Sequence, residues 1–106
     1  MDFRDVDHLP VSVLNYALWR EMAGGRAVPE QIAHGAELVA KLDTGEASTL
    51  ATFARRAWRL VCQLAAEGGR PDYEDTARAR VRSELPFLDD WTFEELWIEA
   101  FRIGMM

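Results

Sequence analysis

Histidine and cysteine, the residues that most often ligate metals or act as nucleophiles, are rare in this chain. The 106 residues include two histidines, His8 and His34, and one cysteine, Cys62. A zinc site needs three or four ligands held close together, but the histidines lie far from Cys62 in the sequence and far from each other. His8 sits among aspartates at a chain end that we expect to be frayed over residues 1–8. We therefore predict neither a metal site nor a cofactor.

The positions of the other candidate groups do not favour catalysis. A cysteine nucleophile needs a neighbouring base and a lowered pKa, whereas Cys62 flanks the apolar positions of a helical pattern, as a buried structural thiol does. Acid–base catalysis needs two inward-facing carboxylates with separated pKa values. Glu95 and Glu99 instead face away from the apolar positions of their own segment. The sequence predicts no catalytic residue, and we expect a protein that is not an enzyme.

Aromatic and acidic residues gather near the C-terminus. Between Phe87 and Phe101 lie five aromatic residues and five carboxylates, which are Asp89, Asp90, Glu94, Glu95 and Glu99. If this segment is a helix, its apolar residues cover roughly 220° of the circumference, about twice the 100° that an ordinary surface helix needs. Such a helix is either the centre of a bundle or a surface that another chain covers.

We expect the two sides of this helix to have different roles. The side that carries Phe93, Trp97 and Ala100 should pack inside the fold. The other edge should contact another chain, because Trp and Met are enriched at protein interfaces and a contiguous exposed apolar patch marks an interaction site. The predicted protein-binding residues are Trp91, Glu94, Glu95, Ile98 and Met105.

Arginines form a second candidate surface. They recur on the polar sides of two neighbouring segments and would form a basic strip if the two helices packed side by side. Phosphate contacts from such a strip would suit a small nucleic-acid-binding regulator. The residues of this alternative are Arg55, Arg56, Arg59, Arg78 and Arg82. Two other interpretations stay open, in which the arginines face solvent or pair with the acidic C-terminal part.

The charge distribution argues against the nucleic-acid alternative. The net charge is −6, whereas a protein that coats nucleic acid is expected to be strongly basic. Residues 1–45 carry 4 basic and 7 acidic side chains, residues 46–82 carry 7 and 5, and residues 83–106 carry 1 and 6. The acidic C-terminal part fits a partner with a basic face, because complementary charges steer association.

The elements that position these residues are predicted to be five helices. Apolar residues recur with the 3.6-residue period, and prolines and glycines separate the repeats. The predicted helices span residues 10–23, 29–43, 47–67, 72–84 and 92–103. Thr92 and Glu95 form a capping-box pattern that should start the last one. Short connections favour antiparallel packing, so we predict an all-α bundle in a single domain, residues 1–106, with the third helix at its centre.

The sequence as a whole predicts a cytoplasmic protein-binding module. A single cysteine excludes an intramolecular disulfide, and the chain shows neither a secretory leader nor an apolar run of about 18 residues that could span a membrane. Its profile is shared by immunity proteins, antitoxins and phage-encoded inhibitors. We therefore expect a small acidic inhibitor or neutraliser of a basic target, or self-association through the last helix into a homodimer.

Overall fold

The computed structural model describes residues 3–67 and 73–104 and is built from helices alone within those ranges. This confirms the predicted all-α fold. The α-helices are α1 (Val11–Ala23), α2 (Ala33–Val39), α3 (Thr44–Glu67), α4 (Glu74–Glu84) and α5 (Asp90–Gly104), and two short 3₁₀ helices are η1 (Phe3–Asp5) and η2 (Glu30–Ile32).

The second and third helices differ from their predicted bounds, because Asp43 is the N-cap residue of α3 and does not belong to the second helix. The amide of Glu46 donates a hydrogen bond to Asp43 Oδ1 over 2.8 Å, which is the bond that an N-cap side chain makes to the first turn. α3 therefore begins at Thr44 instead of residue 47. The chain leaves the second helix at Val39, and the prediction of one continuous helix over residues 29–43 is wrong.

The capping box predicted at Thr92 is also wrong. Asp89 caps α5: its Oδ1 accepts a hydrogen bond from the amide of Thr92 over 2.7 Å, and its carbonyl accepts one from the amide of Phe93 over 2.9 Å. Thr92 is fully buried in the first turn, and its hydroxyl has no partner among the described residues. α5 consequently starts two residues before its predicted start.

The first turn of α4 carries two acids, Glu74 and Asp75. Carboxylates at this end of a helix are stabilised by the helix dipole. The predicted start at Pro71 and Asp72 lies outside the described residues, and the helix ends at Glu84, just before Leu85 and Pro86.

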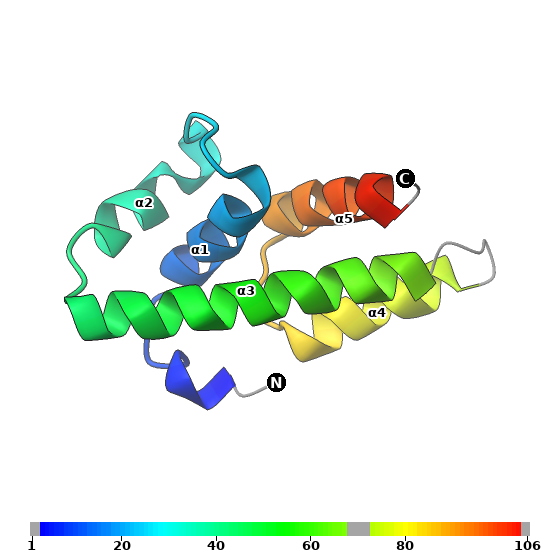
Figure 1. The fold of residues 1–106 in the computed structure, drawn as a ribbon, viewed down its shortest axis with the longest axis horizontal. Coiled ribbons are helices and arrows are strands. Elements are labelled where there is room, and N and C mark those ends of the chain that lie inside the picture. Colours follow the sequence, from blue (N-terminus) through cyan, green and yellow to red (C-terminus); the bar gives the residue numbers. More distant parts are fainter. Residues whose placement is uncertain (1–2, 68–72, 105–106) are drawn as a thin grey trace.

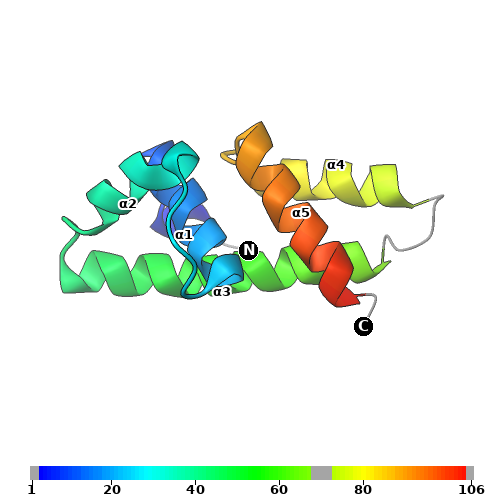
Figure 2. The ribbon, with the colours of Figure 1, turned by 90° about the horizontal axis from the view of Figure 1, so that it is seen from above.

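α3 sets the long axis of the molecule. With 24 residues it spans about 36 Å, and the whole structure is 43 Å long. α1 and α2 lie over its N-terminal half, while α4 runs back antiparallel to its C-terminal half (Figure 1). In the view from above, α5 crosses α3 obliquely, and all the other helices lie on one side of α3 (Figure 2). No described helix covers the opposite side of α3.

The core forms where α1, α4 and α5 meet α3. The buried residues of α3 recur at helical spacing and are Leu50, Phe53, Ala54, Ala57, Val61, Leu64 and Ala65. Leu60 is only partly buried, at the edge of the core. α1 is enclosed further, because it packs against α2, α3 and α5 together. Its residues 13–19 are all buried.

A glycine allows α2 to approach α1 closely. A Cβ atom at Gly35 would lie 2.2 Å from the carbonyl oxygen of Ser12 and 2.8 Å from Cβ of Tyr16. Both distances are shorter than van der Waals contact, so any larger residue at this position would push the two helices apart.

Residues 3–9 pack against this core, where the sequence suggested a frayed end. Val6 and Leu9 are buried, and the ring of Phe3 stacks on that of Phe87 with centroids 5.3 Å apart. Phe53 lies against both rings. The N-terminal segment is therefore anchored through aromatic contacts, which add to the free energy gained by burial.

Candidate protein-binding surface

The inner side of α5 belongs to the core. Phe93, Trp97 and Ala100 are buried with Leu96 in the cluster that α3 and α4 complete. The ring of Phe93 stacks on that of Trp97 with centroids 6.1 Å apart. Trp97 Nε1 is buried and donates no hydrogen bond to a described residue. This side of the helix therefore contributes to stability through apolar burial.

Asn15 of α1 fixes the point at which α5 begins. Its side-chain amide is 1% exposed and donates hydrogen bonds to the carbonyls of Val11 and Phe87, over 2.9 and 3.1 Å. Its Oδ1 accepts a hydrogen bond from the amide of Asp89 over 3.0 Å. Asp89 in turn caps α5. One buried amide thus joins the middle of α1 to the turn that starts α5.

Arg78 and Arg82 of α4 lie against α5. The guanidinium of Arg82 is 4.3 Å from the centre of the Phe93 ring, and that of Arg78 is 5.0 Å from it. Such cation–π contacts hold a charged group over an aromatic face. Of the three interpretations of these arginines, pairing with the acidic C-terminal part is the one that holds for Arg78 and Arg82. The aromatic rings of α5 attract them inward.

The acids of α5 are largely neutralised within the chain. Asp90 pairs with Arg82 at 2.6 Å, Glu94 pairs with Arg78, and Glu99 pairs with Arg102 one turn further along α5. The hydrogen bond from Arg102 holds the pKa of Glu99 below its ordinary value, although partial burial opposes this shift. Among the described acids of α5, Glu95 alone forms no ion pair. The surface of α5 that carries these acids therefore presents both positive and negative charges.

The outer side of α5 carries an uncovered isoleucine. Ile98 is 62% exposed, whereas Ala100, roughly 200° further around the helix, is completely buried. Phe101 is partly exposed on the same side. Glu94 and Glu95 precede Ile98 by about one turn, so the structure places the three residues on neighbouring positions of one helix. Met105 lies outside the described residues.

Trp91 occupies a different environment from Ile98. It packs against a second small cluster formed by Tyr16, Trp19 and Ile32 from α1 and η2. The start of α5 is therefore covered from both sides, by the main core and by α1. Its later turns are covered from the core side only, which explains why Ile98 stays exposed.

The five arginines of the nucleic-acid alternative do not form one strip. Arg55, Arg56 and Arg59 are exposed on α3. Arg78 and Arg82 face α5 instead, where they pair with carboxylates. The basic surface that remains is confined to α3.

Cys62 does not have the environment of a nucleophile. Burial raises the pKa of its thiol, and the negative charge of Glu99 raises the pKa further. Both effects disfavour the thiolate that a nucleophile needs. In the described part of the chain, no group of three or more His, Cys, Asp or Glu side chains could hold a metal ion.

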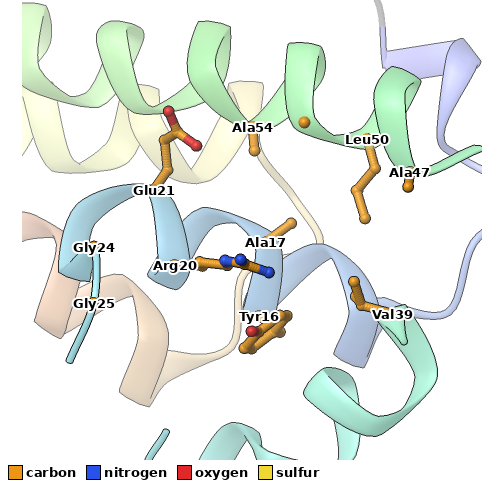
Figure 3. Close-up of a pocket in the computed structure, with 11 residues that line it drawn as sticks. Tyr16, Ala17, Arg20, Glu21, Gly24, Gly25, Val39, Ala47, Leu50 and Ala54 are labelled. Atoms are coloured by element: carbon orange, nitrogen blue, oxygen red, sulfur yellow. The ribbon is translucent and has the colours of Figure 1, made fainter. Parts of the chain in front are cut away.

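A groove between α1 and α3 was not predicted from the sequence. It has a volume of about 700 Å³, and Figure 3 shows Arg20 and Tyr16 side by side in it, with Glu21 nearer α3. Its lining includes Tyr16, Ala17, Arg20, Glu21, Leu50 and Ala54. The only signal in the sequence is a polar pair next to the apolar stripe of α1, and such a pair is equally typical of an ordinary helix boundary.

Comparison of the chain with models of protein families, with curated proteins and with solved structures found no match. Among the described helices, none combines the length and the apolar character needed to cross a membrane.

Proposed function

We propose that the chain is a non-enzymatic protein-binding module that binds its partner through the outer face of α5. The outer face is defined by Glu94, Glu95, Ile98, Phe101 and Arg102. The observation that carries the proposal is the 62% exposure of Ile98 on a helix whose other side is fixed in the core. A partner that covered Ile98 would gain free energy from apolar burial without disturbing the fold.

Single exposed apolar residues are common on protein surfaces, so the neighbours of Ile98 matter. Phe101, one turn later on the same side of the helix, is incompletely covered. Charged groups flank this apolar row on both sides. An apolar centre within a polar rim is the usual anatomy of a protein interface, and it favours a protein partner over a small ligand.

Binding of this kind would suit an inhibitor or neutraliser that acts in the cytoplasm by covering a surface of its target. Ile98 and Phe101 would provide the apolar anchors that dominate affinity in most interfaces. The charged residues around them would chiefly affect the rate of association and the choice of partner. Because three acids of α5 are already paired, we expect the target surface to carry both signs of charge.

The test compares three immobilised baits in an extract of the native host: the unaltered chain, Ile98→Asp and Val11→Asp. Val11 is a matched control, because it is another apolar residue, 55% exposed, on the first turn of α1. We expect that at least one protein from the extract binds to the unaltered chain and to Val11→Asp but not to Ile98→Asp. The purified protein must then bind directly to the unaltered chain and to Val11→Asp, and its affinity for Ile98→Asp must be lower. An identical or empty set of bound proteins for all three baits, together with no self-association that depends on Ile98, would overturn the proposal.

Nucleic-acid binding is the second candidate, favoured by the exposed row Arg55, Arg56 and Arg59 on α3. Phosphate contacts would make such binding fall steeply with salt. We expect no measurable binding to nonspecific duplex DNA at low salt, because the arginines of α4 are engaged by α5. Salt-dependent binding that is lost when the three residues are replaced by Gln would favour this candidate instead.

A further inference from the structure

We propose that the outer face of α5 binds a second copy of the same chain, with the two α5 helices antiparallel and Ile98 against Ile98. This inference rests on the proposed function, because it names the partner of the same surface. It follows from the order of charges along α5: acids precede Ile98 and an arginine follows it. Two antiparallel copies of the helix therefore place opposite charges next to each other.

The spacing of charges about Ile98 provides the complementarity. Glu94 and Glu95 precede Ile98 by four and three residues, and Arg102 follows it by four. At a rise of about 1.5 Å per residue, these groups lie about 6 Å to either side of Ile98 along the helix axis. In an antiparallel pair, Arg102 of the second copy therefore comes level with Glu94 and Glu95 of the first. A two-fold axis generates the same contact twice.

Three of the four groups that would meet are exposed, and Glu95 is partly exposed. The side chains of Glu94 and Arg102 are 48% and 66% exposed, and Ile98 is the most exposed large apolar residue among those described on α5. Their existing partners, Arg78 and Glu99, lie at the sides of the same surface. The new contacts would thus extend an ion-pair network without leaving a charge unpaired.

The mixed charge of the surface favours a second copy over a uniformly basic partner. Asp90, Glu94 and Glu99 each have an arginine beside them, so a basic target would meet these arginines as well as the acids. A second copy presents both signs in reversed order, which brings Arg102 of each copy level with Glu94 and Glu95 of the other.

The dimer should be weak, because a single helix pair buries little surface. Interfaces below about 1,200 Å² are typical of transient complexes. Association should therefore appear at protein concentrations on the order of 0.01–1 mM. It would compete with any other protein that binds Ile98.

The test is a charge exchange followed by analytical ultracentrifugation at these concentrations. Glu95→Arg places a second guanidinium against Arg102 of the other copy, and Arg102→Glu places two carboxylates together. Each variant alone should dimerise about tenfold more weakly than the unaltered chain, since two exposed pairs turn from attractive to repulsive. An equimolar mixture of the two variants should recover dimerisation, because both contacts then join opposite charges.

Two further variants complete the design. Ile98→Asp should be monomeric throughout, whereas Val11→Asp should dimerise like the unaltered chain, and circular dichroism verifies the helical fold of each variant. A chain that stays monomeric at about 1 mM, or a mixture that does not recover association, would overturn the inference. If Ile98-dependent capture of another protein persists in that case, self-association alone has failed and the proposed function stands.

Discussion

α1 and α5 lie side by side, but they are covered in different ways. α1 has buried side chains at every position from 13 to 19, because α2, α3 and α5 surround it. α5 carries more aromatic residues, yet Ile98 on its outer side is 62% exposed. The width of the apolar arc on a helix therefore does not by itself determine how much of the helix is buried. The placement of the neighbouring helices around it does, because α2, α3 and α5 surround α1, whereas no described helix covers Ile98 on α5.

This difference separates two kinds of apolar residue in the same molecule. Those of α1 and of the inner side of α5 stabilise the monomer. Those on the outer side of α5 contribute little to the fold and stay accessible to another chain. The comparison predicts that mutations on the two sides of α5 have effects of different kinds, in the following order of size.

The largest effect is expected from Trp97→Ala on the inner side of α5. Removing a buried aromatic side chain typically costs about 3–5 kcal/mol. Trp97 donates no hydrogen bond to a described residue, so the loss should reflect packing and the contact of its ring with the guanidinium of Arg78. Denaturant unfolding measures it, with Ile98→Ala as a control that should change stability by less than about 0.5 kcal/mol. An equal loss in the free energy of unfolding for Trp97→Ala and Ile98→Ala would contradict the distinction between the inner and outer sides of α5.

Asn15→Ala should have the next largest effect, because it breaks the link between α1 and the start of α5. It leaves the carbonyl of Phe87 and the amide of Asp89 without their partner. Each buried group left unpaired costs about 1–3 kcal/mol. Hydrogen exchange should also become faster in the first turn of α5. A loss below about 0.5 kcal/mol would show that this bond does not hold the two helices together.

A smaller effect is expected from the arginines of α4. Replacing Arg78 and Arg82 together by Gln removes two ion pairs and the contacts over Phe93. We expect a loss of about 1–2 kcal/mol, since exposed ion pairs and cation–π contacts each contribute about 0–1 kcal/mol. The matched control, Arg55→Gln with Arg59→Gln, changes the net charge equally but should leave the melting temperature unchanged. Equal destabilisation by the two double variants would contradict the inward placement of Arg78 and Arg82.

The smallest effect concerns the thiol of Cys62. Because burial and Glu99 raise its pKa, the folded chain resists ionisation of the thiol, and stability should fall as the pH rises above the ordinary pKa of a thiol. Glu99→Gln should lower the pKa of Cys62 and slightly accelerate its alkylation by iodoacetamide at a fixed alkaline pH. Glu95→Gln serves as the control and should leave the rate unchanged. A slower reaction in Glu99→Gln would contradict the electrostatic assignment.

Much of the fold could be predicted from the sequence, because helical periodicity and glycine or proline boundaries are local signals. α1 and the end of α3 match their predicted bounds closely. The start of α5 does not match its predicted bound. Asp89 and Thr92 are both good N-cap residues, and the hydrogen bond from the Asp89 amide to Asn15 decides between them. Which of two possible N-cap residues starts a helix depends on tertiary contacts, and these cannot be predicted from the sequence of that segment alone.

The candidate site was predictable in part. Ile98 was assigned to the uncovered edge from its place on the helix, and it is exposed. Pairing of Arg78 and Arg82 with the acidic C-terminal part was one of three open interpretations, and the sequence could not select it, because the choice depends on Phe93 of another helix lying opposite them. Trp91 was grouped with Ile98, but η2 and α1 cover it. Contacts between distant segments decide all three outcomes.

The most direct test of the central claim, that the outer side of α5 is a binding surface distinct from its core side, is an NMR dilution series of backbone amides. Between about 0.01 and 1 mM, shifts that depend on concentration should appear at Glu94, Glu95, Ile98 and Arg102 and be absent in Ile98→Asp. The exposed arginines of α3 should show no change. Spectra that do not change with concentration, together with identical partner capture by Ile98→Asp, would contradict the claim.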